Sequence, residues 1–271
     1  MSECKVIDCH CHVYPDNIAP KAVSGISEFY DLEETEDLKS RGTVANMQQR
    51  EHAAGIYHQI IFSVATTPHQ VKSINRFIAN AVSGSEKNLT GLGTVHPDSP
   101  DIKQDIDEII NLGLKGIKIH PDFQQIAADD LRFFKVYEYC EGRLPLLIHC
   151  GDYRKNYSNP ENIAPILENF PCLTVVGAHL GGWSVWDEAV KVLPYYNNFF
   201  VDCSSSLQYL KPERALEIIR SYGAEKVMFG TDYPLWDPEE SYKSFLSLNL
   251  TEEEKEQITH LTAEKIFGIE C

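Results

Sequence analysis

Short apolar runs recur along the whole chain, each followed by polar loop residues and then by a stretch with helical periodicity. Eight such runs predict β-strands at residues 6–8, 59–65, 89–95, 116–120, 146–149, 174–179, 199–202 and 227–232. After the second run they are separated by roughly 25–30 residues, the length that a parallel β-α-β crossover with its loops requires. The pattern therefore predicts a parallel sheet built from repeated β/α units.

Helix signals fill the gaps between the predicted strands. Residues 102–112 carry isoleucines at helical spacing behind an acidic first turn, and helices are predicted to start at Pro160, after Pro212 and at Thr251. Asn159 is the expected N-cap of the helix at Pro160. Eight β/α repeats within 271 residues match the size of a TIM (β/α)8 barrel, which we predict as a single domain over residues 1–271.

A doubly wound open sheet is the alternative architecture. Such a sheet usually has a glycine-rich phosphate loop after its first strand, whereas here the first strand continues into His10-Cys11-His12. The barrel is therefore favoured. One long acidic gap, residues 13–58, predicts an inserted segment with short helices on the carboxyl-terminal face of the barrel, either as a lid over the active site or as a surface excursion without function.

Composition and charge narrow the class of protein. The chain is 43% hydrophobic, enough for a sizeable core, and its formal net charge of −16 argues against a nucleic-acid or anionic membrane partner. No apolar run approaches the roughly 20 residues that span a bilayer, and the first residues show no signal-peptide pattern, so we expect a cytoplasmic protein. The eight cysteines form no C-x-x-C pair and are expected to be reduced core residues.

Histidine and aspartate side chains follow five of the predicted strands. In a TIM barrel the carboxyl ends of all strands open on one face, so these residues are expected to converge around one pocket. They are His10, His12, His120, His149, His179 and Asp232.

His10 and His12 are two residues apart and therefore point to the same side of their strand, while Cys9 and Cys11 are expected to face the helices. Two adjacent imidazoles facing the barrel axis are spaced to chelate one cation.

The predicted ligands are His10, His12, His149 and Asp232, with His179 as general acid/base. This donor set suits one Zn²⁺ best, with Mn²⁺, Fe²⁺ or Co²⁺ also chemically allowed. An open coordination position would take a water molecule whose pKa the metal lowers.

The motifs at these strand ends resemble those of the amidohydrolase superfamily. The matching segments are Asp8-x-His10-x-His12, Gly116-Ile117-Lys118-Ile119-His120-Pro121, Ile148-His149-Cys150-Gly151-Asp152, Ala178-His179-Leu180-Gly181-Gly182 and Gly230-Thr231-Asp232-Tyr233-Pro234. More narrowly they resemble the amidohydrolase 2 branch, which includes the aminocarboxymuconate-semialdehyde decarboxylase-like enzymes. The resemblance implies a distorted TIM barrel with one divalent metal, the same four ligands, and His179 and Asp232 as catalytic residues.

Lys118 and His120 share one side of the fourth predicted strand, and both are candidates for substrate contact. Binuclear members of the superfamily carry a carboxylated lysine on this strand, but the branch that this chain resembles is usually mononuclear. Lys118 is therefore interpreted as a substrate-contacting cation, with a structural role and carboxylation as the alternatives.

Further candidate substrate contacts lie in loops after strand ends. They are Tyr153, Arg154, Trp183 and Tyr233, and Trp186 and Trp236 are additional candidates for the pocket wall. Arg154 could clamp a carboxylate through two parallel hydrogen bonds, or it could simply face solvent.

Three functions are compatible with this site. The favoured one is a metal-dependent hydrolase that attacks an amide, ester or lactone of a small carboxylate-bearing substrate. The alternative is a non-oxidative decarboxylase of an aromatic or dienoic acid, and the third is a catalytically silent metal-binding protein. A small-molecule substrate is the expected partner, and the acidic surface is compatible with a homodimer.

Overall fold

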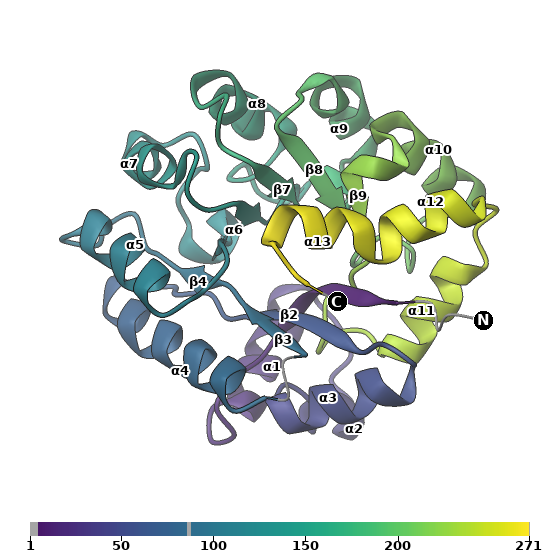
Figure 1. The fold of residues 1–271 in the computed structure, drawn as a ribbon, viewed down its shortest axis with the longest axis horizontal. Coiled ribbons are helices and arrows are strands. Elements are labelled where there is room, and N and C mark those ends of the chain that lie inside the picture. Colours follow the sequence, from purple (N-terminus) through teal and green to yellow (C-terminus); the bar gives the residue numbers. More distant parts are fainter. Residues whose placement is uncertain (1–4, 86–87, 271) are drawn as a thin grey trace.

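Parallel strands form the centre of the molecule and helices surround them (Figure 1). The computed structural model describes residues 5–85 and 88–270. The strands are β1 (Ile7–His12), β2 (His58–Phe62), β3 (Leu89–Gly91), β4 (Gly93–Thr94), β5 (Ile117–Ile119), β6 (Leu146–Ile148), β7 (Val175–Gly177), β8 (Phe199–Asp202) and β9 (Val227–Met228). Each of the eight predicted runs overlaps one of these strands, and the third run contains two; β1 continues four residues beyond its run, and β2 begins one residue before its run.

The third run divides at Leu92, where the chain changes its hydrogen-bonding partner. The N–H of Leu92 donates to the carbonyl of Ile61, next to β2, and the N–H of Gly93 donates to the carbonyl of Gly116, next to β5. Strands β3 and β4 therefore act as one stave that joins the β1-β2-β3 sheet to the β4–β9 sheet.

The first and last staves also meet. The N–H of Cys9 donates to the carbonyl of Phe229 over 3.0 Å, and the N–H of His12 donates to the carbonyl of Tyr233 over 2.7 Å. These bonds close β1 against the segment around β9, so the eight staves form a closed ring. The predicted TIM barrel is confirmed.

The helices that follow β2 alternate with the strands as expected for β/α repeats. They are α4 (Val71–Ser83), α5 (Ile102–Asn111), α6 (Pro121–Gln124), α7 (Leu131–Cys140), α8 (Pro160–Asn169), α9 (Trp186–Val192), α10 (Pro212–Tyr222), α11 (Pro238–Leu246), α12 (Glu252–Glu256) and α13 (Thr262–Phe267). The predicted start at Thr251 is confirmed, because its side chain caps α12 together with Glu254. No helix in the described parts of the chain is long and apolar enough to cross a lipid bilayer.

Two apolar clusters form the core. The larger lies between the strands and the outer helices, and the smaller contains side chains of the staves, such as Ile7, Ile60 and Leu147, together with Phe267 and Ile269. Helix α13 therefore covers the amino-terminal end of the barrel, and Figure 1 shows it crossing in front of the strands.

The cysteines with described positions form no disulfide bonds. Cys9 packs in the smaller cluster, whereas Cys11 lies 4.0 Å from Glu51 of α3 (Val44–Ala53), so the expectation that both face the helices is wrong for Cys9. The β-bulge described below is the reason. Cys172 is exposed, which differs from the expected core position, and Cys4 and Cys271 lie outside the described residues.

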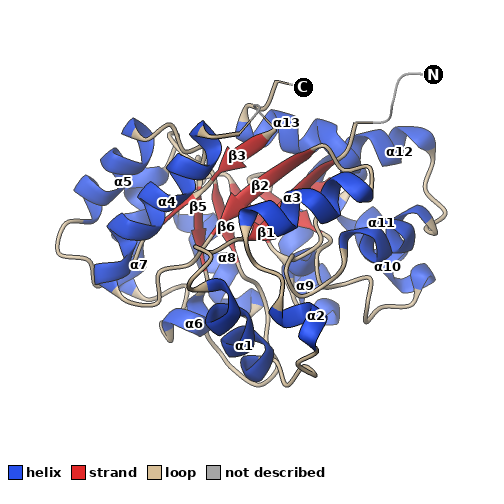
Figure 2. Cartoon of the chain, turned by 90° about the horizontal axis from the view of Figure 1, so that it is seen from below, coloured by secondary structure: helices blue, strands red, loops and turns tan. Residues whose placement is uncertain are grey.

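The segment 13–58 contains three helices between β1 and β2: α1 (Ala19–Phe29), α2 (Glu36–Lys39) and α3. Figure 2 shows α1 and α2 at the end of the barrel opposite α13. This is the end at which the strands finish, so α1 lies over the face where the predicted site residues converge.

Candidate metal centre and active site

A β-bulge in β1 turns His10 and His12 into the barrel. Asp8 pairs with Gln59 and Cys11 with Ile61, so β1 has one more residue than β2 over this interval. The extra residue lets Ile7 and the two histidines face the same interior, although strict alternation would separate position 7 from positions 10 and 12. Both imidazoles are buried and contact the ring of Phe62 at centroid distances of 5.1 and 4.8 Å.

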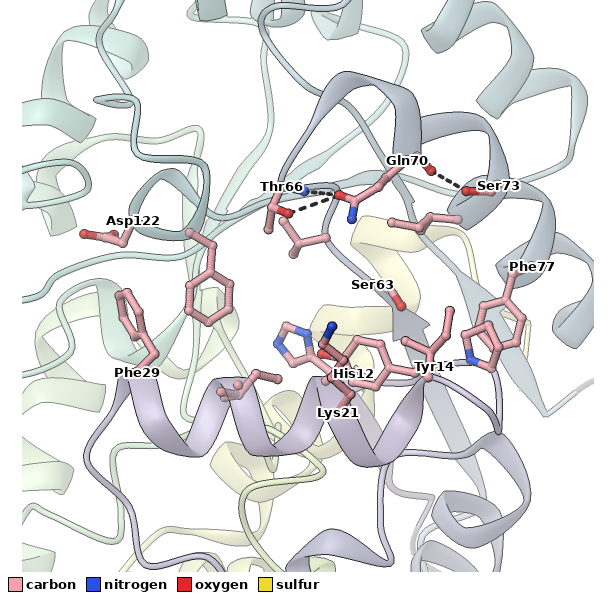
Figure 3. Close-up of a pocket in the computed structure, with 18 of the residues that line it drawn as sticks. His12, Tyr14, Lys21, Phe29, Ser63, Thr66, Gln70, Ser73, Phe77 and Asp122 are labelled. Atoms are coloured by element: carbon pink, nitrogen blue, oxygen red, sulfur yellow. Dashed lines mark hydrogen bonds between the residues drawn. The ribbon is translucent and has the colours of Figure 1, made fainter.

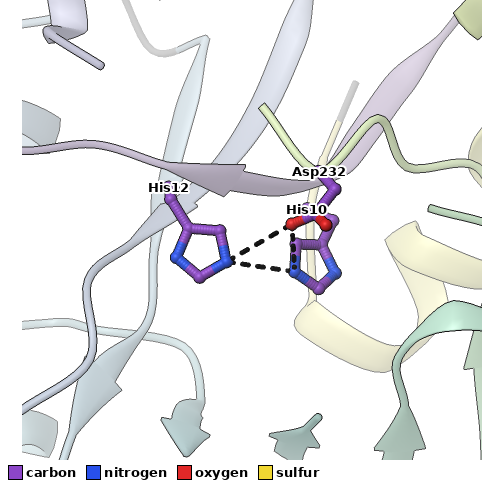
Figure 4. Close-up of side chains that lie close together, drawn as sticks. All are labelled: His10, His12 and Asp232. Carbon is purple, nitrogen blue, oxygen red and sulfur yellow. Dashed lines mark hydrogen bonds and ion pairs between the residues drawn. The ribbon is translucent and has the colours of Figure 1, made fainter. Parts of the chain in front are cut away.

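Three of the four predicted ligands come together: His10, His12 and Asp232, called the metal group below (Figure 4). Nε2 of His10 lies 3.3 Å from Nε2 of His12 and 3.3 Å from Oδ1 of Asp232. Nε2 of His12 lies 3.5 Å from the same carboxylate oxygen. Burial lowers the pKa of His10 to about 3 and also lowers the pKa of His12. Burial alone would raise the pKa of Asp232, but His10 and His12 outweigh it and hold the carboxyl ionised.

This donor set fits a divalent cation. Two neutral imidazoles and one carboxylate are typical ligands of Zn²⁺ and related metals. Donor atoms about 3.3 Å apart suit a common ion, because each bond from such a metal to nitrogen or oxygen is about 2.0–2.2 Å long. His10, His12 and Asp232 would therefore hold the metal.

Asp202, at the end of β8, orients His10. Its Oδ2 lies 2.9 Å from Nδ1 of His10, so Nδ1–H donates to the carboxylate and the lone pair of Nε2 points toward Asp232. Several contacts, His10 foremost, outweigh burial and hold the pKa of Asp202 well below its usual range. The sequence analysis missed this residue, although it ends a predicted strand as the other site residues do.

His149, the fourth predicted ligand, lines the same pocket but lies outside this three-residue group. Its Nδ1 is 3.0 Å from Nε2 of His179, and its Nε2 is 3.0 Å from the carbonyl oxygen of Gly151. Nδ1 of His179 is in turn 3.0 Å from the carbonyl oxygen of Ser204. Both rings are thus held by backbone carbonyls, and neither presents a free nitrogen to the Asp232 carboxylate in this arrangement.

The backbone is left-handed at both predicted catalytic residues. His179 has φ of 60° and Asp232 has φ of 63°, a region that residues other than glycine seldom occupy. Ser205, whose hydroxyl donates to Oδ2 of Asp232, has φ of 45°. Such conformations cost about 1–3 kcal/mol each and concentrate at functional sites, where surrounding contacts enforce them.

Lys118 and His120 both line the pocket. Nζ of the fully buried Lys118 is 3.4 Å from Nε2 of His10, and burial lowers its pKa to about 8. His120 stacks between Phe123 and His149, with ring centroids 3.7 and 3.9 Å away. Its Nε2 is 3.0 Å from the hydroxyl of Tyr30, a residue of the inserted segment that sequence reasoning did not find.

The candidate substrate contacts that were predicted in loops lie outside the pocket that His10, Lys118 and His120 line. Arg154 is held by both carboxylate oxygens of Asp152 and by the carbonyl of Phe29, and its guanidinium lies 5.5 Å from the Trp183 ring. Trp183 lines a second small pocket, which His149, His179 and Asp232 also line.

Tyr153 and Tyr233 do not line the pockets formed by the described residues. The side chain of Tyr153 is 72% exposed. Tyr233 is fully buried, and its hydroxyl is bonded to Gly42 and Asn46, because Tyr233 belongs to the seam that closes the barrel. Of the additional aromatic candidates, Trp236 lines the same second pocket as Trp183 and donates to Ser205. Trp186 donates to the carbonyl of His179.

A larger cavity of about 690 Å³ opens beside His12 (Figure 3). It lies between α1 on one side and the start of α4 on the other, with α6 at one end. Three residues line both this cavity and the small pocket that contains His10, Lys118 and Asp232; they are His12, Ile26 and Phe123. The two spaces are therefore adjacent.

Comparison with known structures supports the fold along its whole length. An uncharacterized TIM-barrel protein from Bordetella bronchiseptica is 22% identical, with a TM-score of 0.79 and coverage of 97% of this chain and 98% of that one. The 5-carboxyvanillate decarboxylase LigW from Sphingomonas paucimobilis is 18% identical, with a TM-score of 0.79 and coverage of 98% and 100%. The 5-carboxyvanillate decarboxylase from Novosphingobium aromaticivorans, in complex with manganese and a nitrobenzoic acid, is 17% identical, with a TM-score of 0.78 and coverage of 97% and 96%.

Because the sequence identities to these three proteins are low, the structural similarity establishes the fold of this chain and not its activity. A search of curated proteins found no matching sequence. The family comparison is decisive, because the model of the amidohydrolase family, in its amidohydrolase 2 branch, matches residues 7–269. The chain is a member of the amidohydrolase family.

Proposed function

We propose that the protein is a metal-dependent, non-oxidative decarboxylase of an aromatic carboxylic acid. The observation that carries the proposal is one buried pocket that combines a cation-binding group and Lys118 with walls formed by Tyr30, Phe123 and Leu235. Positive charge suits the carboxylate that leaves as carbon dioxide, and the adjoining cavity of about 690 Å³, which His12 and Phe123 also line, has room for the ring. The activities named for the two decarboxylases of the same fold support this choice over hydrolysis.

The reaction replaces a carboxylate by a proton. A proton adds to the ring carbon that bears the carboxylate, the C–C bond breaks, and its electron pair returns to the ring as carbon dioxide leaves. A bound divalent metal, Zn²⁺ or Mn²⁺, would supply positive charge for the substrate oxygens. Lys118 is the second cation in the pocket, and Asp202 keeps His10 in the orientation that the ligand role requires.

His179 is the residue we assign to proton transfer. Its Nδ1 faces the carbonyl of Ser204, and Nε2 shares a hydrogen bond with Nδ1 of His149. Burial lowers the pKa of His179, so the protonated ring gives up its proton more readily than an exposed imidazolium does. Asp232 opposes this shift through its negative charge and stabilises the protonated ring.

The test follows the carbon and the proton separately. Protein loaded with Mn²⁺ or Zn²⁺ is incubated with hydroxybenzoic acids in D₂O, and carbon dioxide and the deuterium content of the product are measured. We expect one carbon dioxide and one ring deuterium per turnover, and loss of both in His179→Asn and Asp232→Asn. Turnover of amides, esters or lactones without any release of carbon dioxide would refute the proposal.

Hydrolysis is the second candidate. The observation that favours it is the ionised carboxylate of Asp232 within the metal group, which could accept a proton from an attacking water. The same incubation with a panel of amides and lactones distinguishes the two reactions, since hydrolysis in ¹⁸O-labelled water places the label in the product acid.

A further inference from the structure

The 690 Å³ cavity is far larger than a single aromatic ring needs. An apolar protein cavity of about 150 Å³ already accommodates benzene. A substrate with one small ring at the metal group would leave most of this adjacent space empty.

The cavity wall is mainly apolar. On the α1 side it is formed by Ile18, Ala22, Gly25 and Phe29, which lie three or four residues apart and therefore share one face. On the opposite side it is formed by Ile74 and Phe77 of α4. Figure 3 shows α1 along one edge of the cavity and Phe77 at its far end, with His12 between them.

The middle of the α1 face is hollow because its two central residues are small. A Cβ atom added to Gly25 would have no neighbour within 4 Å among the described residues. Glycine inside a helix costs about 1 kcal/mol relative to alanine. Gly25 is exposed at the edge of the cavity and keeps space open there at a cost in helix stability, and neither a tight packing contact nor a positive φ requires it.

Few charges face this space. Among the lining residues only Lys21 and Asp122 are charged, and the carboxylate of Asp122 accepts a hydrogen bond from Ser158. Lys21 is exposed on α1. Uncharged polar side chains also line the cavity, among them Thr66, Gln70 and Ser73, but these three bond to one another. The face of α1 and the side chains of Ile74 and Phe77 therefore remain for an apolar group.

We propose that the substrate is an aromatic acid with a long apolar substituent, which extends from the metal group past His12 into the cavity between α1 and α4. This inference rests on the proposed decarboxylation. The carboxylate would reach the pocket around His10 and Asp232, whose volume of about 10 Å³ leaves no room for a ring. The ring would lie beside His12 in the large cavity, and the substituent would cover Ala22, Gly25, Ile74 and Phe77. His12, Ile26 and Phe123, which line both spaces, mark the passage between them.

The kinetic test compares 2,6-dihydroxybenzoic acid with its 3-hexyl and 4-hexyl derivatives. We expect kcat/KM for at least one hexyl acid to exceed that of the parent acid about tenfold or more, since each buried methylene favours binding. Gly25→Phe fills the hollow, so this preference should fall to about one. Glu28→Phe is the matched control: it adds the same ring to an exposed position of α1 outside the cavity lining and should retain the preference.

A binding measurement keeps the inference independent of turnover. Isothermal titration of metal-free protein with 5-hexylresorcinol should give a dissociation constant at least tenfold below that of resorcinol, and Gly25→Phe should abolish the difference while circular dichroism shows an intact fold. If none of the three acids releases carbon dioxide but 5-hexylresorcinol binds at least tenfold more tightly than resorcinol, the decarboxylase proposal fails and the apolar subsite stands. The apolar subsite is refuted if the wild type shows equal kcat/KM values and equal dissociation constants for the short and long compounds. It is also refuted if Gly25→Phe retains the preference of the wild type.

Discussion

Asp202 is a fully buried carboxylate that orients His10, one of the predicted metal ligands. It receives Nδ1–H of His10 on one oxygen, and its other oxygen accepts the backbone N–H groups of His179 and Ser204. One side chain thus fixes the orientation of His10 and the backbone position of His179.

We expect Asp202→Asn to weaken metal binding about 10- to 100-fold, because the amide no longer enforces the tautomer of His10. Metal titration with a competing chelator measures this, together with turnover at saturating metal. Asp187→Asn is the control, since Asp187 pairs with Arg214 on the exposed surface. An unchanged affinity in Asp202→Asn would show that His10 is oriented by other contacts.

His58, at the start of β2, makes folding depend on pH. Burial lowers its pKa to about 4 in the folded protein, against about 6.5 in an unfolded chain. The fold therefore holds the neutral ring, and its stabilisation is present above pH 6.5 and is lost as the pH falls from 6.5 to 4.

Replacing His58 by Gln, which can still donate to Thr90, should remove this dependence. We expect the free energy of unfolding of the wild type to fall by about 2 kcal/mol more than that of His58→Gln between pH 7 and pH 4.5. Urea unfolding at several pH values measures the difference. His69→Gln, at an exposed position, should behave as the wild type does.

At the scale of elements, α1 is attached to the barrel face through Arg154. The guanidinium donates to the carbonyl of Phe29 and lies 5.3 to 5.5 Å from the rings of Phe29, Tyr30 and Trp183. Because Tyr30 in turn contacts His120, this attachment connects the inserted segment with the pocket.

We expect Arg154→Met to accelerate amide hydrogen exchange of residues 26–32 about tenfold and to lower kcat/KM, since both the hydrogen bonds and the cation–π contacts are lost. Mass-spectrometric hydrogen exchange localises the effect. Arg132→Met removes a surface arginine that pairs with Asp98 and Asp130, and it should leave exchange in α1 unaltered. Equal exchange in Arg154→Met and wild type would mean that α1 is held by its apolar face alone.

Regular elements were predictable because their signals are local. Apolar runs predicted every stave, and proline or threonine predicted several helix starts. Asn159 is instructive: it occupies the N-cap position of α8, but its side chain accepts from the N–H of Asp152 and does not cap the helix. A tertiary contact thus replaced the expected local one.

The candidate site was predictable only in part. His10, His12 and Asp232 were predicted to lie together because the two histidines are two residues apart near the carboxyl end of β1 and Asp232 follows β9. The β-bulge, the contact of Tyr30 with His120 and the burial of Tyr233 depend on contacts between distant segments, which periodicity does not encode.

For the whole molecule, the two ends of the barrel have separate tasks. The amino-terminal end is closed by α13, where Phe267 is 2% exposed and packs in the smaller core cluster. The opposite end carries the predicted metal ligands His10, His12 and Asp232 and the three pockets described above. We therefore expect stability and chemistry to depend on opposite ends of the barrel.

Phe267→Ala tests this separation. We expect a loss of about 3–5 kcal/mol in the free energy of unfolding, because a buried aromatic ring is removed, and an unaltered metal affinity of the folded protein. Urea unfolding and metal titration measure the two effects. Leu131→Ala, at a side chain that is 77% exposed, should change stability by less than about 0.5 kcal/mol. A large loss of metal affinity in Phe267→Ala would show that the two ends are coupled.

The seam between β1 and the segment after β9 has a consequence for biosynthesis. His10 and His12 leave the ribosome well before Asp232, and the hydrogen bond from His12 to Tyr233 forms only when both segments are present. A nascent chain therefore lacks the third donor until its last stave is made. A chain that stops before this stave would leave the ring open, and we expect it to bind the metal that His10, His12 and Asp232 are predicted to hold more weakly than the closed barrel does.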